Sequence, residues 1–437
     1  MQRTTSRTSC ALAFALALAL AGALAHAQTY DAPTRTVTVA PSGSDDTAAI
    51  RTAFDVCAAV GPGCTVRLTE GTFVTRQHVI RGFDGRFVGA GADRTFIEPR
   101  TPLHVTDAEM VLMHPPTDDE PWPILFLFVD ARMTLADLAF RVRDRIITTP
   151  WNIFDLQIEA LATLVSLTGQ DVRVDVERIA MESGEGSFFG FNVINGLYVQ
   201  GILPGPSGGF DDRPRVSGTV TVRDSRFVGQ YGGVQIENAD GANVVIEGNV
   251  VDGALSVYVQ DVANGVIEVR GNDISTVDTG VFVSAGGFYT PAAAGRVLVL
   301  DNTVHVREGG TGVAISDTGA VATLQAIVMG NVFELMDAAA AVGGTALGVL
   351  VRDNVLQGRA TAGVRVGPAP RPEAAAGEAP EDPDPSVGWW IGGNEGGSFE
   401  STEATVWLTE FAEGTVVVCG AGGTLRDEGQ GTLAACD

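Results

Sequence analysis

The sequence predicts an all-β chain whose short strands wind into a solenoid, and three features of residues 216–366 lead to this prediction. An eight-residue pattern recurs, in which alternating apolar residues are followed by Gly or Asp, a polar residue and one more apolar position. The copies are separated by 24, 23, 30, 29 and 23 residues, and a short period with insertions is typical of stacked repeats. A second alternating segment follows most copies without any helical period, so each repeat contributes strands.

The repeats assign residues to fixed places in each turn. The six copies read VTVRDSRF, VVIEGNVV, IEVRGNDI, VLVLDNTV, AIVMGNVF and VLVRDNVL. Two apolar columns are expected to face inward, one from Val222 to Val351 and one from Phe227 to Leu356. Ser225 holds the polar place in the first copy, and Asn holds it in the other five: Asn249, Asn272, Asn302, Asn331, Asn354. Gly or Asp before this place favours a bend, because both tolerate left-handed backbone.

This pattern resembles the right-handed parallel β-helix of the pectate lyase-like superfamily, in which Asn residues stack at one bend. Residues 41–75 strengthen the resemblance, since they look like the helix that covers the N-terminal mouth of many such proteins. Asp45, Asp46 and Thr47 are candidates for the start of that helix, and Gly61 ends it. The resemblance implies a single-stranded right-handed parallel β-helix with a short N-terminal capping α-helix. For Asp45 and Asp46, capping is favoured over chemistry.

The chain is expected to begin with a secretory signal peptide. Arg3 and Arg7 precede an Ala- and Leu-rich run at 11–25, and cleavage is expected after Ala27. No later segment is long and apolar enough for a transmembrane helix. The protein is therefore expected to be secreted, periplasmic or on the cell surface. We expect five regions: 1–27 signal peptide, 28–98 N-terminal cap and first coils, 99–366 β-helix, 367–388 Pro- and Ala-rich loop, 389–437 last coil and C-terminal cap.

Composition limits the partners. The formal net charge is −25, and all 28 basic residues are Arg. Nucleic acid is an improbable partner for such an acidic chain. The absence of lysine excludes a lyase that uses a Lys base, and the sequence lacks the motif sets of polygalacturonases and alginate epimerases. The negative net charge itself is explained by its contribution to solubility.

Four cysteines follow the signal segment, in two pairs that are close in sequence. An exported protein can form disulfides, so the prediction is Cys57–Cys64 and Cys419–Cys436, one near each end of the solenoid. Four free buried thiols are the alternative. No His lies near them in sequence, which disfavours zinc.

Outward positions of the first strand form a charged face. Its members are Asp175, Glu177, Arg223, Glu247, Glu268, Arg270. Pectate lyases of this fold place Asp and Glu on such a face to bind calcium, so the resemblance makes Asp175, Glu177 and Glu247 candidate ligands. No cofactor is required, but calcium is compatible with this face. An ion-pair ladder between coils is the favoured alternative, because acidic and basic residues alternate down one column.

Outward positions of the second strand form an aromatic and amide face that suits sugar rings. The candidate substrate-binding residues are Tyr198, Gln235, Tyr258, Phe282. Insertions at 200–218 and 284–296 follow this strand in their coils and are expected to wall a groove. The candidate catalytic carboxylates are Asp211, Asp212, Glu237, Asp261. The alternative is an aromatic stack packed beneath the two loops.

Three functions remain open from the sequence. The first is an exported β-helix protein that binds a polysaccharide or cell-surface glycan without turnover, or a structural surface protein. The second is a polysaccharide lyase or glycoside hydrolase acting in the groove between the two insertions. The third is a calcium-assisted lyase on the charged face. Two carboxylates with raised pKa values on the aromatic face would favour the second function.

Overall fold

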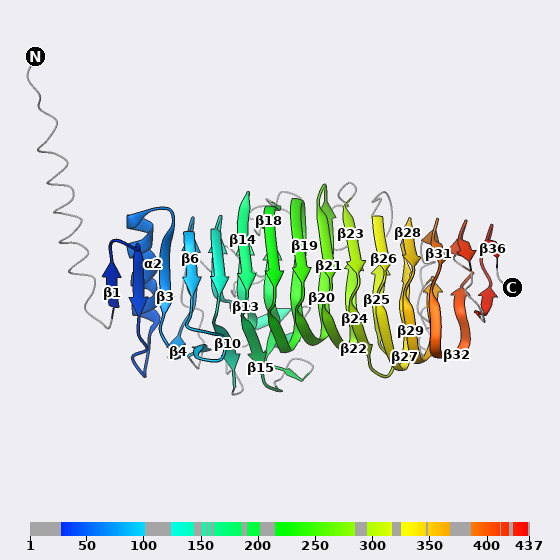
Figure 1. Cartoon of the computed structure of the whole chain (residues 1–437), viewed down its shortest axis with the longest axis horizontal. Coiled ribbons are helices and arrows are strands. Elements are labelled where there is room, and N and C mark those ends of the chain that lie inside the picture. The colour runs from blue at the N-terminus through cyan, green and yellow to red at the C-terminus, as the bar shows by residue number, and fades with distance from the viewer. Residues whose placement is uncertain are drawn as a thin grey trace, which may run out of the picture.

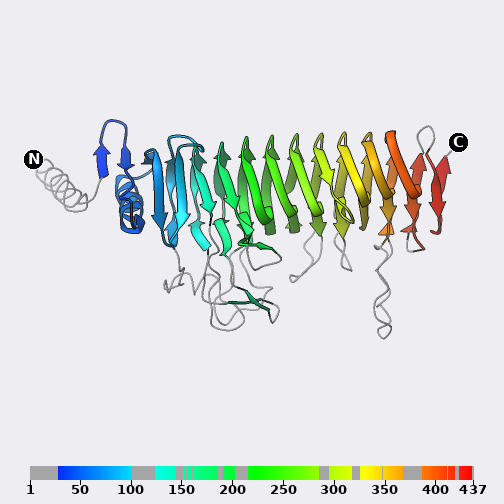
Figure 2. The same ribbon diagram turned by 90° about the horizontal axis from the view of Figure 1, so that it is seen from below.

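The computed structural model describes residues 28–100, 124–143, 151–153, 156–158, 161–185, 190–201, 215–284, 295–316, 325–346, 348–367, 386–410, 412–418 and 423–435. Their strands stack as successive turns of one long coil, from β1 at one end to β36 at the other (Figures 1 and 2). The predicted parallel β-helix is confirmed. In the described part of the chain no helix is long and apolar enough to cross a membrane. The predicted signal peptide lies outside the described residues.

Each full turn contributes strands to three faces of the coil, and within each face neighbouring turns pair in parallel. Face 1 contains β2 (Thr36–Val39), β3 (Cys64–Leu68), β6 (Asp84–Val88), β9 (Arg132–Ala136), β14 (Val172–Glu177), β18 (Val216–Arg223), β21 (Val266–Arg270), β23 (Arg296–Leu300), β26 (Gln325–Met329), β28 (Val349–Arg352), β31 (Trp390–Gly392), β34 (Val416–Val418) and β36 (Leu433–Ala435). At its outer edge β1 (Gln28–Asp31) pairs antiparallel with β2.

Faces 2 and 3 follow face 1 along each turn. Face 2 contains β4 (Gly71–Thr75), β7 (Thr95–Pro99), β10 (Ala139–Val142), β15 (Ala180–Ser183) and β24 (Thr303–Val306). Face 3 contains β5 (His78–Arg81), β8 (Ile124–Val129), β13 (Leu161–Thr168), β17 (Val193–Gln200), β25 (Thr311–Ser316) and β35 (Leu425–Asp427). Long strands turn the corner between faces: β19 (Arg226–Glu247), β20 (Val250–Ala263), β22 (Asp273–Ser284), β27 (Val332–Thr345), β29 (Val355–Val366) and β32 (Glu395–Leu408).

Two small strand pairs lie outside these faces. They are β11 (Trp151–Ile153) with β12 (Leu156–Ile158), which is antiparallel, and β30 (Ser386–Val387) with β33 (Ala412–Glu413), which is parallel.

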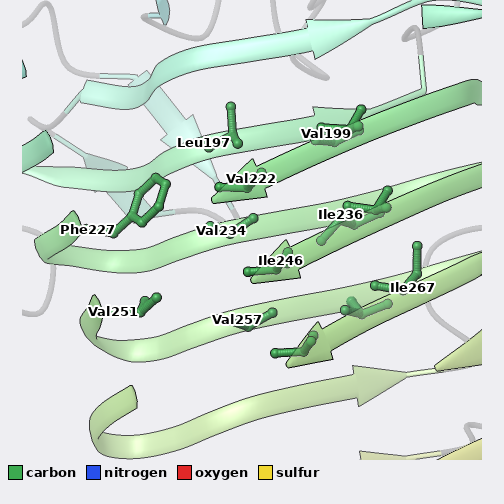
Figure 3. Packing of buried hydrophobic residues seen from close by; sticks show 14 of the residues in the cluster. Leu197, Val199, Val222, Phe227, Val234, Ile236, Ile246, Val251, Val257 and Ile267 are labelled. Carbon is green, nitrogen blue, oxygen red and sulfur yellow. The ribbon is translucent and has the colours of Figure 1, made fainter. Parts of the chain in front are cut away.

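The two predicted inward columns form the core. Val222 pairs with Ile246 on face 1, and Phe227 pairs with Val251 on face 2. All four side chains are fully buried, and Figure 3 shows them directed into the coil. Burial of one such side chain stabilises the fold by about 1.5–3 kcal/mol, and the same contact recurs in every turn. The core is therefore one continuous column along the axis.

Helix α2 (Thr47–Val60) covers the N-terminal end of this core, as expected from residues 41–75. Phe54 points from α2 into the coil, where its ring meets Phe83 and Phe87 edge-on at centroid distances of 5.0 and 5.1 Å. Asp45 accepts hydrogen bonds from the Thr47 backbone and hydroxyl. Asp46 accepts from the backbone N–H groups of Ser42 and Val74, which joins the start of the helix to β4.

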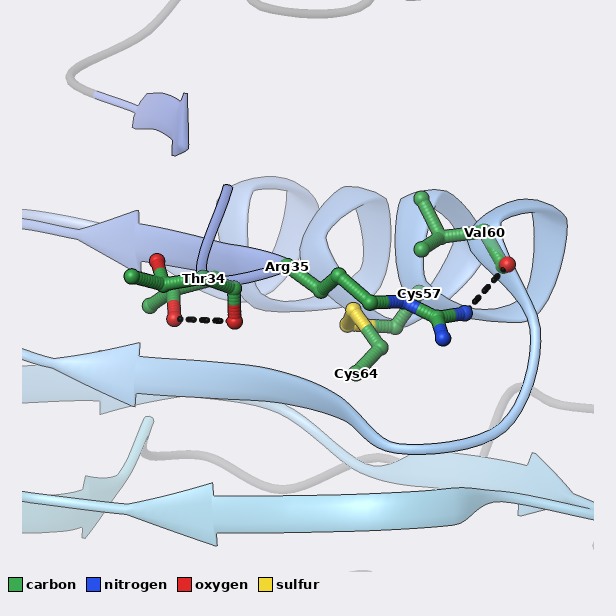
Figure 4. The surroundings of a disulfide bond; sticks show 6 residues. Thr34, Arg35, Cys57, Val60 and Cys64 are labelled. Atoms are coloured by element: carbon green, nitrogen blue, oxygen red, sulfur yellow. Dashed lines mark hydrogen bonds between the residues drawn. A yellow bond between two sulfur atoms is a disulfide. The ribbon is translucent and has the colours of Figure 1, made fainter. Parts of the chain in front are cut away.

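A disulfide joins Cys57 of α2 to Cys64 of β3 (Figure 4). The Arg35 guanidinium donates a hydrogen bond of 2.7 Å to the Val60 carbonyl, at the C-terminal end of the same helix. Both contacts hold the capping helix against the first coil. The predicted partners Cys419 and Cys436 lie outside the described residues.

The Asn residues form a buried ladder at the corner between faces 1 and 2. Asn272 Nδ2 donates to Asn302 Oδ1 at 2.9 Å and to the Ile246 carbonyl at 2.9 Å. The same bonds link the successive members of the ladder: Asn249, Asn272, Asn302, Asn331, Asn354, Asn394. Ser225 ends it, since its backbone N–H donates to Asn249 Oδ1. The residue before each member has positive φ, 60° at Gly271 and 52° at Asp301, as the bend requires.

We predict that Asn302→Ala lowers the free energy of unfolding by about 3 kcal/mol, because the Asn272 backbone N–H and Nδ2 both lose a buried acceptor. Urea denaturation followed by circular dichroism measures the change. Asn243→Ala is the control. Asn243 is exposed on face 1, so its substitution should change the free energy of unfolding little. Equal losses in the two variants would contradict a stabilising ladder.

Candidate functional site

The four predicted substrate-binding residues occupy one column on the outer side of face 3. The strand register pairs Tyr198 with Gln235, Gln235 with Tyr258, and Tyr258 with Phe282. The residues on either side of each, such as Val257 and Val259 beside Tyr258, face the core and are buried. Alternation along the strand therefore directs the four side chains away from the core.

Glu237 lies two residues after Gln235, at the C-terminal end of a face 3 strand segment, and is 7% exposed. Its Oε2 accepts a hydrogen bond from the Tyr198 hydroxyl on the preceding coil. It also accepts one from Gln235 Nε2 at 3.0 Å. Two hydrogen-bond donors, one from each of two adjacent coils, therefore converge on one carboxylate oxygen of Glu237.

Asp261 occupies the next coil, directly after Gln260, which pairs with Glu237. It is 1% exposed, and neither carboxylate oxygen has a hydrogen-bond partner among the described residues. Burial first, and then the negative charge of Glu237, raise the pKa of Asp261 to about 7, while Arg215 opposes the shift. Asp261 and Glu237 are therefore close in space, and their surroundings differ: one carboxylate has donors and the other has none.

Two aromatic rings lie beside these carboxylates. Tyr258 and Phe282 are stacked, with ring centroids 5.1 Å apart and planes inclined by 9°. The Tyr258 hydroxyl donates to Gln260 Oε1. Burial, followed by the charges of Glu237 and Asp261, raises the pKa of Tyr258 above its usual range. The phenol is therefore neutral and acts as a hydrogen-bond donor and a ring surface.

The structure brings together only part of the predicted catalytic set. Glu237 and Asp261 lie at the ends of adjacent face 3 segments, whereas Asp211 and Asp212 lie outside the described residues. The same holds for most of the two predicted loops, of which only the flanking residues are described. Sequence reasoning missed Arg215, whose charge acts on Asp261. No periodic signal marks it, because it stands between an insertion and the first residue of β18.

The predicted metal candidates lie on face 1, and two of them, Glu177 and Glu247, pair with an arginine on the next coil. Glu177 binds Arg178 at 2.9 Å and Arg223 at 2.8 Å, and these contacts, Arg178 first, lower the pKa of Glu177. Arg270 joins Glu247 and Glu268, each at 3.0 Å. Asp175 lies two residues before Glu177 on β14. In the part of the chain that the structure describes, no three His, Cys, Asp or Glu side chains are grouped to hold a metal ion.

Several solved structures share this architecture at low sequence identity. A mutant DFA-IIIase from Arthrobacter chlorophenolicus A6, in complex with DFA-III, aligns with a TM-score of 0.54 at 10% identity, over 89% of this chain and 94% of that one. The Agl-KA catalytic domain aligns with a TM-score of 0.51 at 12% identity, over 91% of this chain and 66% of that one. The chain therefore shares a right-handed parallel β-helix fold with these solved structures. No protein-family model matches this β-helix, and no curated protein matches its sequence significantly.

We predict that Asp261→Asn raises Tm at pH 8 by several degrees and leaves it unchanged at pH 4. The pKa of Asp261 is about 7 in the folded β-helix, against an ordinary value of 3.8. As pH rises from about 4 to about 7, the unfolded chain loses this proton while the folded chain keeps it, so stability falls; above 7 the full penalty applies. Asn removes the penalty.

Thermal unfolding followed by circular dichroism across this pH range measures the effect. Asp240→Asn is the control, because Asp240 is exposed and lies just beyond the segment that contains Glu237, one coil before Asp261. A parallel Tm–pH profile for wild type and Asp261→Asn would show that Asp261 ionises normally.

Proposed function

We propose that the protein is an exported carbohydrate-active enzyme that cleaves a glycosidic bond on the outer side of face 3. The observation that carries this proposal is the proximity of two carboxyl groups in different surroundings. Asp261 is buried with a raised pKa and without a hydrogen-bond partner among the described residues, and Glu237 accepts two hydrogen bonds. Glycoside cleavage needs one carboxylic acid and one carboxylate near the same bond, and divergent surroundings assign these roles.

In the proposed reaction, the Asp261 carboxyl donates its proton to the glycosidic oxygen as the bond to the anomeric carbon breaks. A water molecule adds to that carbon, and its proton passes to the Glu237 carboxylate. The reaction consumes one water and leaves Asp261 ionised and Glu237 protonated, and solvent proton transfer restores both. Tyr198 and Gln235 orient Glu237 through their hydrogen bonds.

The aromatic residues supply the binding surface in this proposal. Tyr258 and Phe282 present apolar ring surface one coil apart, next to the amide of Gln260. Sugar rings combine apolar C–H faces with hydroxyl groups, so they suit such a surface. These contacts also support the second candidate function, which is glycan binding without turnover.

We predict that Asp261→Asn and Glu237→Gln each lower kcat at least about 100-fold, because each removes one of the two proton-transfer groups. Release of reducing ends from a panel of polysaccharides, with and without calcium, measures turnover. The kcat of the wild type should fall as pH rises through about 7, where Asp261 loses its proton. Glu268→Gln on face 1 is the control and should retain activity.

The panel also separates the alternatives. Binding of a glycan by wild type and both variants, without product from any of them, would establish the non-catalytic function. Ultraviolet absorbance of unsaturated uronate that depends on calcium and is lost in Glu268→Gln would instead establish the lyase on face 1.

A further inference from the structure

Arg365 is a buried cation on the outer side of face 3. It lies in β29 between Val364 and Val366, which face the core, so its side chain is directed outward. It is nevertheless only 5% exposed. Register places it in the same column as Phe282, three coils further along the axis: Phe282, Ala314, Gly343, Arg365.

The Arg365 guanidinium has no counterion within the described residues. No hydrogen bond or ion pair joins it to any of them, and its Nε is buried without an acceptor. Burial lowers the pKa of Arg365, but an arginine in a protein keeps its charge. Most described arginines pair with a carboxylate; on the same strand, Arg359 binds Asp337. In a chain with 53 acidic and 28 basic residues, a buried arginine without a carboxylate partner is therefore unexpected.

Small residues occupy the column on the two coils between Phe282 and Arg365. One face of the Phe282 ring stacks on Tyr258, and the next coil on its other side carries Ala314. The following coil carries Gly343, where a Cβ atom would lie 3.5 Å from Arg365 Nη2, so the guanidinium lies across this glycine. Since coils are about 4.8 Å apart, roughly 10 Å separates the Phe282 coil from the coil beneath the guanidinium.

We propose that a sugar unit bearing a carboxylate or sulfate binds above Ala314, between the Phe282 ring and the Arg365 guanidinium. The ring stacks on the sugar, and the guanidinium binds the anionic oxygens with parallel N–H bonds. This subsite rests on the proposed carbohydrate function and adds that the ligand is an acidic glycan. It lies two coils beyond Tyr258, whose coil ends in Asp261, so the ligand extends along the helix axis.

Isothermal titration calorimetry of the full chain tests this subsite. The probes are oligosaccharides from polygalacturonate and alginate, each with its carboxyl-reduced form, and from carrageenan, with its desulfated form. Wild type should bind at least one acidic probe at least about 10-fold more tightly than its neutral match, and Arg365→Gln should remove this difference without changing affinity for the neutral form. The carboxylate and sulfate probes distinguish the two anionic groups.

Two further variants complete the test. Arg359→Gln, on the same strand, should leave all affinities unchanged. Ala314→Leu should weaken the binding of acidic and neutral probes alike, because it places a larger side chain between the Phe282 ring and the Arg365 guanidinium. Arg365→Gln should melt at the wild-type temperature or above it, because it removes an unpaired buried charge.

Four results would overturn the subsite: no preference for any acidic probe, an unchanged preference in Arg365→Gln, a lower melting temperature in that variant, or full affinity in Ala314→Leu. Turnover by Asp261→Asn would refute the proposed catalytic roles but leave the calorimetric result standing, so the two proposals fail separately.

Discussion

Parallel pairing between coils, in a register that shifts only at local bulges of the described strands, is the constraint on which the rest of this structure depends. It gives every residue the neighbours of its own column. The Asn ladder enforces it, because an amide both donates and accepts and can therefore repeat the same bond in each turn. A one-residue slip at Asn302 would break these buried bonds and turn Val299 from the core to solvent. The register therefore determines both which side chains form the core and which form the outer columns.

The same constraint explains why much was predictable from sequence. A period of 23 residues with insertions identified the coil, and it placed Val222, Phe227 and their successors inward. It also assembled Tyr198, Gln235, Tyr258 and Phe282 into one outward column. Asn394 was missed as a ladder member, because the segment before it interrupts the period and its own strand is short.

Burial on the outer faces could not be predicted in this way, although alternating charges did indicate the ion pairs of face 1. Alternation places Glu247, Glu237 and Arg365 outward alike, yet Glu247 forms an exposed ion pair while the other two are buried. Whether an outward side chain finds a counterion depends on what its neighbours across coils offer. Glu247 has Arg270 on the next coil, whereas Arg365 has Gly343 and Trp407. The repeat period alone does not indicate which of these outward side chains are buried.

The contrast between the faces argues for function on face 3. On face 1, Glu177, Glu247 and Glu268 each have an arginine. On face 3, Asp261 and Arg365 are buried ionisable groups, and neither the carboxylate oxygens of Asp261 nor Nε of Arg365 has a hydrogen-bond partner among the described residues. Each therefore destabilises the fold, and a continuous core that is independent of the outer face can tolerate this cost. If only the stability of the coil mattered, Asp261 and Arg365 would each be expected to have a counterion or to be replaced by an apolar residue.

The backbone at Asp261 adds a separate reason. Its φ is 52°, a left-handed conformation that glycine adopts without strain. The corner before Asn272 has the same conformation, and glycine fills it. Asn238 holds the position equivalent to Asp261 one coil earlier, also at positive φ, so the bend needs a tolerant residue but not a carboxyl group. The bend accounts for a residue that tolerates positive φ, as Asp301 does, but no hydrogen bond among the described residues accounts for a buried carboxyl group at this position. Its raised pKa distinguishes Asp261 from the aspartates at the other bends.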